Sequence, residues 1–239
     1  MKVLAFDTSN QALTAALTED DRIINELITT NNKNHSVTLM PAIQQLMAEA
    51  GWQPLDLDRI VTAQGPGSYT GLRIGVTTAK TLAYTLKKEL VGISSLATIA
   101  ANARNRQGLL VPIFDARRQN VYAGIYRWEQ DTLVQEAPDR HIPLIRLAEE
   151  LSDQKEVLFL GTDTAKFRDL LAEYAPHAAI NEIPQWDVPH GSVLAALGTQ
   201  AEPVADLDGF LPAYLKRVEA EEKWLATHDP GDEAYVEKI

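Results

Sequence analysis

Residues 64–73 read Gln-Gly-Pro-Gly-Ser-Tyr-Thr-Gly-Leu-Arg, a glycine-rich turn between two apolar segments. The run at 60–63 before it predicts a buried strand, and the helical periodicity after it predicts a helix over residues 71–87. A strand, a glycine-rich turn and a helix in this order direct backbone N–H groups toward one point. The turn is therefore predicted either to receive an anion or to pack tightly against another backbone.

The residue types of this turn suit both interpretations. Glycines permit positive φ or close approach, the proline stiffens the turn, and the serine or threonine can cap the helix. The spacing fits neither a P-loop, which needs a Lys-Ser/Thr pair after its last glycine, nor the dinucleotide motif G-x-G-x-x-G. The residues predicted to contact a partner or a nucleotide are Gly65, Pro66, Gly67, Ser68, Thr70, Gly71 and Arg73.

The composition indicates a well-formed core and a strong negative charge. The chain has 239 residues, 45% of them hydrophobic, with no cysteine and a net charge of −11. This length allows one large domain or two lobes, and the lack of cysteine excludes disulfides and thiolate chemistry. The first residues read as a strand rather than a signal peptide, and no apolar run is long enough for a membrane span. We expect a cytoplasmic protein without membrane contact.

The charge also bears on nucleic acid as a ligand. Affinity for nucleic acid depends mainly on lysine and arginine side chains that neutralise phosphates. An acidic chain is a poor stand-alone binder by this criterion. The short basic stretches at 87–88, 104–106 and 117–118 are interpreted as solvated surface.

The first hundred residues predict the order β-β-β-α-β-α-β-α. Short spacing makes the first three strands an antiparallel meander, and the second helix is the one that follows the glycine turn. Pro41 lies inside the first helix and predicts either a kink or an irregular first turn. The predicted strands are 2–7, 12–17, 22–29, 60–63 and 90–93, and the predicted helices are 35–50, 71–87 and about 95–104.

The second half repeats this order. Residues 111–115 read Val-Pro-Ile-Phe-Asp and repeat the form of residues 3–7, Val-Leu-Ala-Phe-Asp. At the same offset Gln119 matches Gln11 and Ala123 matches Ala15. Internal repetition indicates fold more strongly than a single motif does. The repeat predicts an α/β protein of two tandem lobes, each a mixed β-sheet flanked by helices.

Two lobes of this kind resemble the ribonuclease-H-like lobes of the actin-like ATPases and sugar kinases, the ASKHA fold. We expect a first lobe over residues 1–104 and a second over 105–205. A helix over about 212–226 is predicted to pack back on the first lobe, and 227–239 to form a frayed tail. Proteins of this fold hold a nucleotide in the cleft between their lobes.

Asp7 and Asp115 end the two equivalent strands, so we expect both side chains to face the cleft. In the ATPases that the fold resembles, the first of these aspartates helps to hold magnesium and precedes a glycine-containing phosphate loop. Here Asp7 precedes Thr-Ser-Asn and Asp115 precedes Ala-Arg-Arg. Side chains at these positions hinder the approach of phosphate to the backbone. The sequence therefore argues against tight nucleotide binding by the chain alone.

The histidines predict no metal site. No two are spaced four apart on a helix, and none has the carboxylate arrangement of a metal centre. They are His35, His141, His177, His190 and His228.

Several stretches together resemble the TsaB family. They are residues 4–9, 35–41, 65–75 and 91–96, with weaker similarity at 115–117 and 214–221, and the run Gly-Pro-Gly-Ser-Tyr-Thr-Gly-Leu-Arg is the most specific. The resemblance implies a role in attaching threonylcarbamoyl to N6 of adenosine 37 in tRNAs that read ANN codons. It implies a TsaD-like catalytic paralogue and a TsaE-like ATPase as partners, with tRNA reached only indirectly.

The resemblance also implies a non-catalytic subunit. TsaD carries its metal on a His-x-x-x-His motif, and the matching positions here are Ser95 and Ile99, which cannot replace two imidazoles. We expect no catalytic residue, metal or cofactor on the chain alone, and ATP or ADP with Mg only in the assembled complex.

The helices at 35–50 and 71–87 are expected to meet their TsaD equivalents in a pseudo-twofold contact, or a second copy of the chain when TsaD is absent. The alternative is that their apolar stripes face only their own sheet. The residues predicted for this interface are His35, Val37, Met40, Met47, Gly75 and Thr78.

Two other functions are left open. One is a stand-alone ATPase or sugar-type kinase of the same fold, which tight binding of Mg-ATP to the isolated chain would favour. The other is a glycoprotease-type metallopeptidase, which a stoichiometric metal ion would favour.

Overall fold

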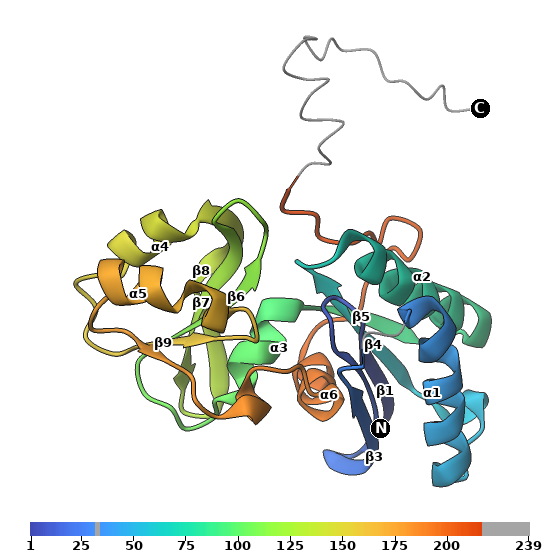
Figure 1. Cartoon of the computed structure of the whole chain (residues 1–239). Helices are drawn as coiled ribbons and strands as arrows, with labels where there is room; N and C mark the ends of the chain where they lie inside the picture. Colours follow the sequence, from blue (N-terminus) through green and yellow to red (C-terminus); the bar gives the residue numbers. More distant parts are fainter. Residues whose placement is uncertain (32–33, 217–239) are drawn as a thin grey trace, which may run out of the picture.

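Two lobes stand side by side in the computed structural model, which describes residues 1–31 and 34–216 (Figure 1). Each lobe contains one five-stranded sheet. The strands of the first are β1 (Lys2–Asp7), β2 (Leu13–Glu19), β3 (Arg22–Thr29), β4 (Arg59–Gly65) and β5 (Glu89–Ser94). The strands of the second are β6 (Leu109–Asp115), β7 (Asn120–Glu129), β8 (Thr132–Pro143), β9 (Val157–Leu160) and β10 (Ala179–Ile180).

The two sheets have the same topology. The first has the order β3-β2-β1-β4-β5 and the second, read from its other end, has the order β8-β7-β6-β9-β10. In each sheet the leading strand pairs antiparallel with the next strand and parallel with the strand after the meander. The predicted duplication and the predicted fold class are confirmed.

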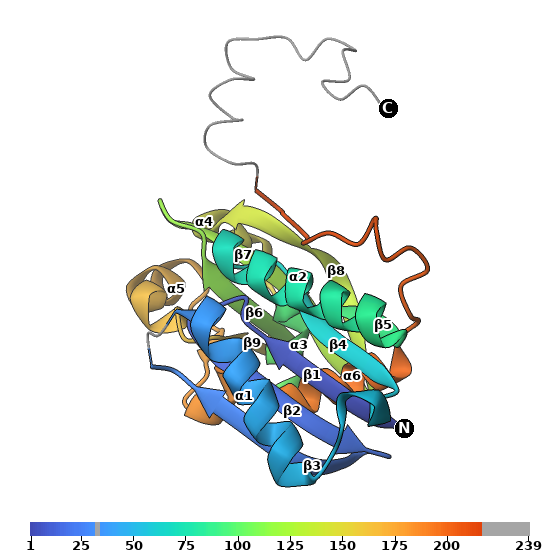
Figure 2. The same ribbon diagram turned by 90° about the vertical axis from the view of Figure 1, so that its right-hand side faces the viewer.

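Helices cover both faces of the first sheet. α1 (His35–Ala50) and α2 (Tyr69–Leu86) lie on one face, as Figure 2 shows, and α6 (Gly191–Gln200) lies on the other. Alternate residues of β1 therefore enter different cores. Leu4 and Phe6 pack beneath α1 and α2, whereas Val3 and Ala5 pack against α6. This explains why the strand reads as a continuous apolar run.

The second sheet is covered in the same way. α4 (Leu144–Glu150) and α5 (Arg168–Tyr174) pack on one face, and α3 (Ser95–Asn102) packs on the other. In the described part of the chain, three short 3₁₀ turns complete the order of elements, at Pro54–Asp56, Thr164–Phe167 and Pro184–Trp186. α3 follows the first sheet in sequence but packs on the second, and α6 follows the second but packs on the first. The lobes thus exchange one helix each.

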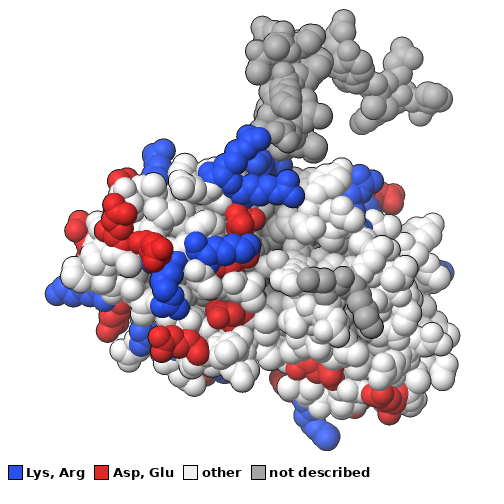
Figure 3. Space-filling view, viewed as in Figure 1, with Lys and Arg blue, Asp and Glu red and all other residues white. Residues whose placement is uncertain are grey.

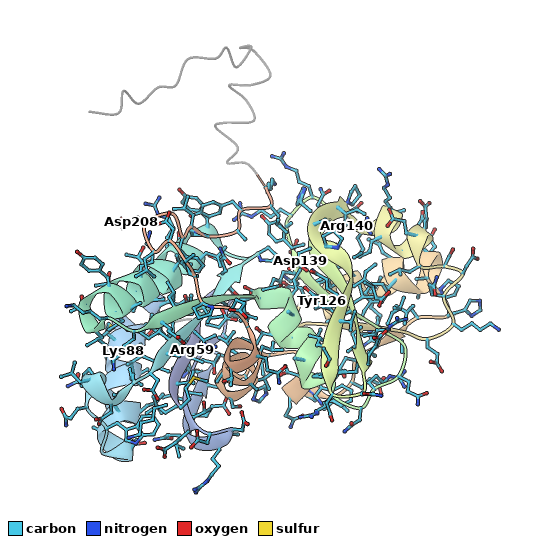
Figure 4. The ribbon with its side chains drawn as sticks, turned by 180° about the vertical axis from the view of Figure 1, so that it is seen from behind. Arg59, Lys88, Tyr126, Asp139, Arg140 and Asp208 are labelled. Atoms are coloured by element: carbon cyan, nitrogen blue, oxygen red, sulfur yellow. The ribbon has the colours of Figure 1, made fainter. Side chains whose placement is uncertain are left out.

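Arg59 fastens α6 to the first sheet. Its guanidinium donates hydrogen bonds to the carbonyls of Gly198 (2.7 Å), Thr199 (3.2 Å) and Ala201 (3.1 Å) at the C-terminal end of α6. It also forms an ion pair with Glu89 at 2.7 Å. Figure 4 shows Arg59 beside this helix.

A half-buried carboxylate, that of Asp139, ties the junction of β5 and α3 to the second sheet. Asp139 accepts hydrogen bonds from the hydroxyls of Ser94 and Tyr126 and from Gln135 Nε2, the last at 3.1 Å. Figure 4 shows Tyr126 and Asp139 close together on the second sheet. Burial raises the pKa of Asp139, although its three donors favour the ionised carboxylate.

After α6 the chain returns along the first lobe. The Val204 N–H donates to Leu90 O, the Ala213 N–H donates to Gln64 O, and Phe210 is buried against Gly92. The helix predicted from about 212 is wrong for residues 212–216, which are not helical because their backbone follows β4. Residues 217–226 and the predicted tail at 227–239 lie outside the described residues.

No helix in the described part of the chain is both long enough and apolar enough to cross a membrane.

Candidate functional site

The glycine-rich turn lies where β4 ends and α2 begins. Ser68 caps α2, because its Oγ accepts a hydrogen bond from the Gly71 N–H at 3.3 Å. The Ser68 N–H donates to Ser9 O at 2.7 Å, and Thr8 Oγ1 donates to Gly71 O at 2.8 Å. Gly65 has φ +125°, a conformation that suits glycine. The turn is therefore bonded to residues 8 and 9, which follow β1.

Close packing explains why the next three glycines of this region cannot carry a side chain. A Cβ on Gly67 would lie 2.2 Å from Ser9 O, and one on Gly71 would lie 2.0 Å from Thr8 O. A Cβ on Gly75 would lie 2.6 Å from Thr8 Oγ1. Of the two predicted uses, the turn serves tight packing against another backbone. The amides of Ser68 and Gly71 donate within the protein, so they do not point at an open anion site.

Asp7 is buried at the end of β1. Its Oδ1 accepts a hydrogen bond from the Ser9 N–H at 2.6 Å. Burial raises the pKa of the Asp7 carboxyl to about 6, while the Ser9 hydrogen bond and the nearby His35 act in the opposite direction. This carboxyl is enclosed and does not line the cleft, so the predicted cleft position is wrong for Asp7.

Asp115 occupies the equivalent position in the second lobe. Its Oδ1 accepts from the Arg117 N–H at 2.8 Å, as Asp7 accepts from Ser9. It does line the cleft, as predicted, and its Oδ2 lies 3.2 Å from Lys166 Nζ. Lys166 also pairs with Asp163 at 2.7 Å. The hydrogen bond to Asp163, and after it the one to Asp115, raises the pKa of the Lys166 ammonium.

An open cleft of about 510 Å³ separates the lobes above these turns. Both lobes and the returning chain form its walls. The lining residues from the first lobe are Ser9, Asn10, Pro66, Gly67, Ser68, Tyr69, Thr70 and Leu72, those from the second lobe are Phe114, Asp115, Ala116, Arg117, Tyr122 and Asp163, and those from the returning chain are Ala213, Tyr214, Leu215 and Lys216.

The predicted partner residues lie in different environments. Val37 and Met40 are 66% and 46% exposed, so they are available to a partner. The Nε2–H of His35 donates to Asn10 O at 2.9 Å, and Thr78 is half-buried on α2. Met47 is only 7% exposed, because it packs in the core beneath α1, so this prediction is wrong. The prediction for Gly75 is also wrong, because the Thr8 side chain covers this position.

Few charged side chains lie on α1 and α2. Lys, Arg, Asp and Glu occur in these two helices only at Glu49, Arg73 and Lys80. In Figure 3 the middle of the first lobe's visible surface is almost free of charge, whereas charges are dense on the second lobe.

The α3 positions that match the metal-binding histidines of TsaD are both buried. Ser95 and Ile99 are 0% exposed, and Ile99 packs against the second sheet. Over residues 1–31 and 34–216, no cluster of three or more His, Cys, Asp or Glu side chains is arranged to hold a metal ion.

Three features of this region were not predicted from the sequence. The backbone oxygens of Thr8 and Ser9 and the Thr8 hydroxyl contact the glycine-rich turn, and apolar periodicity does not reveal such contacts. Tyr69 stacks on Tyr214 with ring centroids 5.0 Å apart. Residues 117–119 all have positive φ without any glycine. Of these features, only Tyr69 had a signal in the sequence, because it lies within the glycine-rich turn at residues 64–73.

Together the fold and this region define a class: a two-lobed protein of the actin-like ATPase fold in which the glycine turn of the first lobe is closed against its own backbone. The model for the family "TsaD: tRNA N6-adenosine threonylcarbamoyltransferase" matches residues 22–224. The tRNA threonylcarbamoyladenosine biosynthesis protein TsaB of Bacillus subtilis is 45% identical over 226 residues, which cover 94% of this chain and 98% of that protein. The chain belongs to the TsaB family.

Two further proteins are similar to this chain. TsaB of Escherichia coli is 30% identical over 133 residues, which cover 55% of this chain and 57% of that protein. A Pseudomonas aeruginosa protein described as similar to the peptidase YeaZ is 27% identical, with a TM-score of 0.77, covering 90% of this chain and 99% of that one.

Proposed function

We propose that this chain is a non-catalytic activating subunit in tRNA threonylcarbamoyladenosine biosynthesis. It pairs with a TsaD-like catalytic paralogue, and a TsaE-like ATPase joins the pair. The assembled complex modifies N6 of adenosine 37 in tRNAs that read ANN codons. The observation that carries the proposal is the match along nearly the whole length of a protein named for this pathway.

The fold supports a role beside a sister subunit. The match to the TsaD family model spans both lobes, so a TsaD-like partner shares this architecture and presents equivalents of α1 and α2. Pairing of equivalent surfaces is the rule in symmetric and pseudo-symmetric dimers. In the absence of TsaD, the same surface serves a homodimer.

The composition of the α1 and α2 face favours a buried contact. Interface cores are depleted of charged residues and enriched in methionine and aromatic residues. Val37 and Met40 are exposed apolar side chains on α1, and Glu49 is the charged residue of this helix. Burial of the exposed parts of the two side chains against a partner contributes about 1–2 kcal/mol each.

Two buried positions on α3 support a non-catalytic role for this chain. Ser95 and Ile99 are enclosed in the core, so they offer no ligand atoms to a metal in the cleft. We propose that nucleotide and Mg are held by the assembled complex rather than by this chain.

Reconstitution tests the proposal. The purified chain is expected to transfer no threonylcarbamoyl to an unmodified tRNA transcript, and addition of TsaD and TsaE is expected to produce transfer. Mixtures that lack this chain serve as the control and should be inactive. Transfer by the chain alone, or full transfer by TsaD and TsaE without it, would contradict the proposal.

A further inference from the structure

The mouth of the interlobe cleft carries an exposed group of aromatic and basic side chains. Tyr69, at the start of α2, and Tyr214, on the returning chain, are 46% and 44% exposed although their rings stack at an interplanar angle of 26°. Arg73 lies 5.5 Å from the Tyr69 ring centre and donates to its hydroxyl at 2.8 Å. Arg117 and Lys216 line the same cleft.

The local charge differs from that of the whole chain. The net charge is −11, yet Figure 3 shows lysine and arginine side chains gathered where the two lobes meet above the cleft. The two carboxylates that line it, Asp115 and Asp163, are both within 3.2 Å of Lys166. Their charge is thereby partly compensated, which leaves Arg117 and Lys216 to attract an anion.

The loop that presents Arg117 adopts a conformation that favours glycine. Arg117, Arg118 and Gln119 have φ values of 69°, 53° and 58°. Left-handed backbone at a non-glycine residue is costly and is concentrated at functional sites. The equivalent loop of the first lobe, residues 8–11, contains no residue of positive φ. This backbone conformation is kept by a loop that presents the Arg117 side chain at the wall of the cleft.

We propose that this cleft mouth binds a segment of an RNA strand. A base stacks on the Tyr69 and Tyr214 pair, and backbone phosphates contact Arg117 and Lys216. Stacking on exposed aromatic rings beside cationic side chains is the common chemistry of single-stranded RNA recognition. The proposal deepens the proposed function, on which it rests, because it makes the tRNA a direct ligand of this chain despite its acidic composition.

Binding of a fluorescein-labelled unmodified tRNA transcript to the full chain, followed by fluorescence anisotropy over a salt series, tests the proposal. Arg117→Gly is expected to weaken binding at least fivefold and to lower the salt slope by about one. It should not lower the melting temperature, since glycine relieves the left-handed backbone. Gln130→Gly is the matched control, because Gln130 also has positive φ, 55°, and lies in the distant β7–β8 turn. It should leave the affinity unchanged.

The aromatic pair is tested separately. Tyr214→Ala and Tyr69→Ala are each expected to weaken binding about tenfold, a loss within the range measured for one stacked base. Tyr84→Ala removes an exposed tyrosine near the other end of α2 and should have no effect.

Three results would overturn the inference: Arg117→Gly within twofold of the wild type, equal losses for Tyr84→Ala and Tyr69→Ala, or AMP bound as tightly as the transcript. Reconstituted transfer can persist in each of these cases, so failure of the inference is distinguishable from failure of the proposed function.

Discussion

Single atoms decide how closely α2 approaches the end of β1. The backbone oxygens of Thr8 and Ser9 occupy the space that a Cβ on Gly71 or Gly67 would need. The hydrogen bond from Thr8 Oγ1 to Gly71 O fixes the same contact. The glycine-rich turn therefore packs α2 closely against the end of β1 and so sets the position of the exposed face of α2 relative to the first sheet.

Gly71→Ala tests this reading. The new Cβ would lie 2.0 Å from Thr8 O, a backbone atom that cannot move without shifting β1. We expect a loss of about 3 kcal/mol or more in the free energy of unfolding, measured by urea denaturation. Gly51→Ala is the control, since nothing lies within 4 Å of its Cβ and only its φ of +67° is unfavourable. It should cost about 1 kcal/mol. Equal losses for the two variants would contradict the packing account.

Asp7 should make stability depend on pH. Its pKa is raised from 3.8 to about 6 by burial, so the folded state binds the proton more tightly than the unfolded state. The free energy of unfolding therefore falls as pH rises from about 4 to about 6, by about 3 kcal/mol at most. The Asp7→Asn variant has no carboxyl to titrate at this position. Its free energy of unfolding relative to that of the wild type should therefore increase between pH 4 and pH 6. A difference that stays constant between pH 4 and 7 would contradict the assignment.

At the scale of elements, docking of α6 depends on one buried cation. Arg59 joins β4 to three carbonyls at the end of α6 and to Glu89. At the other end of α6, the Gly191 N–H donates to Thr14 Oγ1 at 2.9 Å. The helix is thus held at both ends by the sheet of the lobe to which it does not belong in sequence.

Arg59→Met should weaken this docking. Methionine fills similar volume but donates no hydrogen bond, so we expect a loss of about 3 kcal/mol in the free energy of unfolding. Arg146→Met is the control, because the Arg146–Glu150 pair is 3.6 Å long and exposed. Its loss should be under about 0.5 kcal/mol. A similar small loss for Arg59→Met would contradict the role of this residue.

Element order was predictable from sequence, whereas the faces that the helices bury were not. Apolar patterning placed β1, β3 and α1 at the boundaries that the structure has, and the Phe-Asp repeat predicted the duplication. Periodicity cannot tell which sheet a helix packs on, so the exchange of α3 and α6 was missed. For the same reason Met47, one of several apolar residues on α1, was assigned to a partner surface although it packs inward.

At the scale of the whole molecule, the helix exchange joins the lobes. Without α6, the first sheet would expose Val3, Ala5, Val61 and Val91. A fragment of residues 1–104 is therefore expected to aggregate or to stay unfolded by circular dichroism, whereas the full chain unfolds in one cooperative transition. A soluble, folded fragment 1–104 would contradict this expectation.

The same exchange leaves α1 and α2 on the outside of the first lobe, opposite α6 (Figure 2). Their face is weakly charged, and the second lobe does not cover it. We propose that a TsaD-like sister subunit covers this surface or, without it, a second copy of the chain.

The most direct test of this claim is sedimentation of the chain with its TsaD partner when a charge is placed on the face. Val37→Asp with Met40→Asp should abolish the heterodimer, because two carboxylates would be buried unpaired, while the melting temperature of the isolated chain stays unchanged. Ile183→Asp, an exposed apolar position on the second lobe, is the matched control and should leave the heterodimer intact. A heterodimer that survives the double substitution with unaltered affinity would contradict the account.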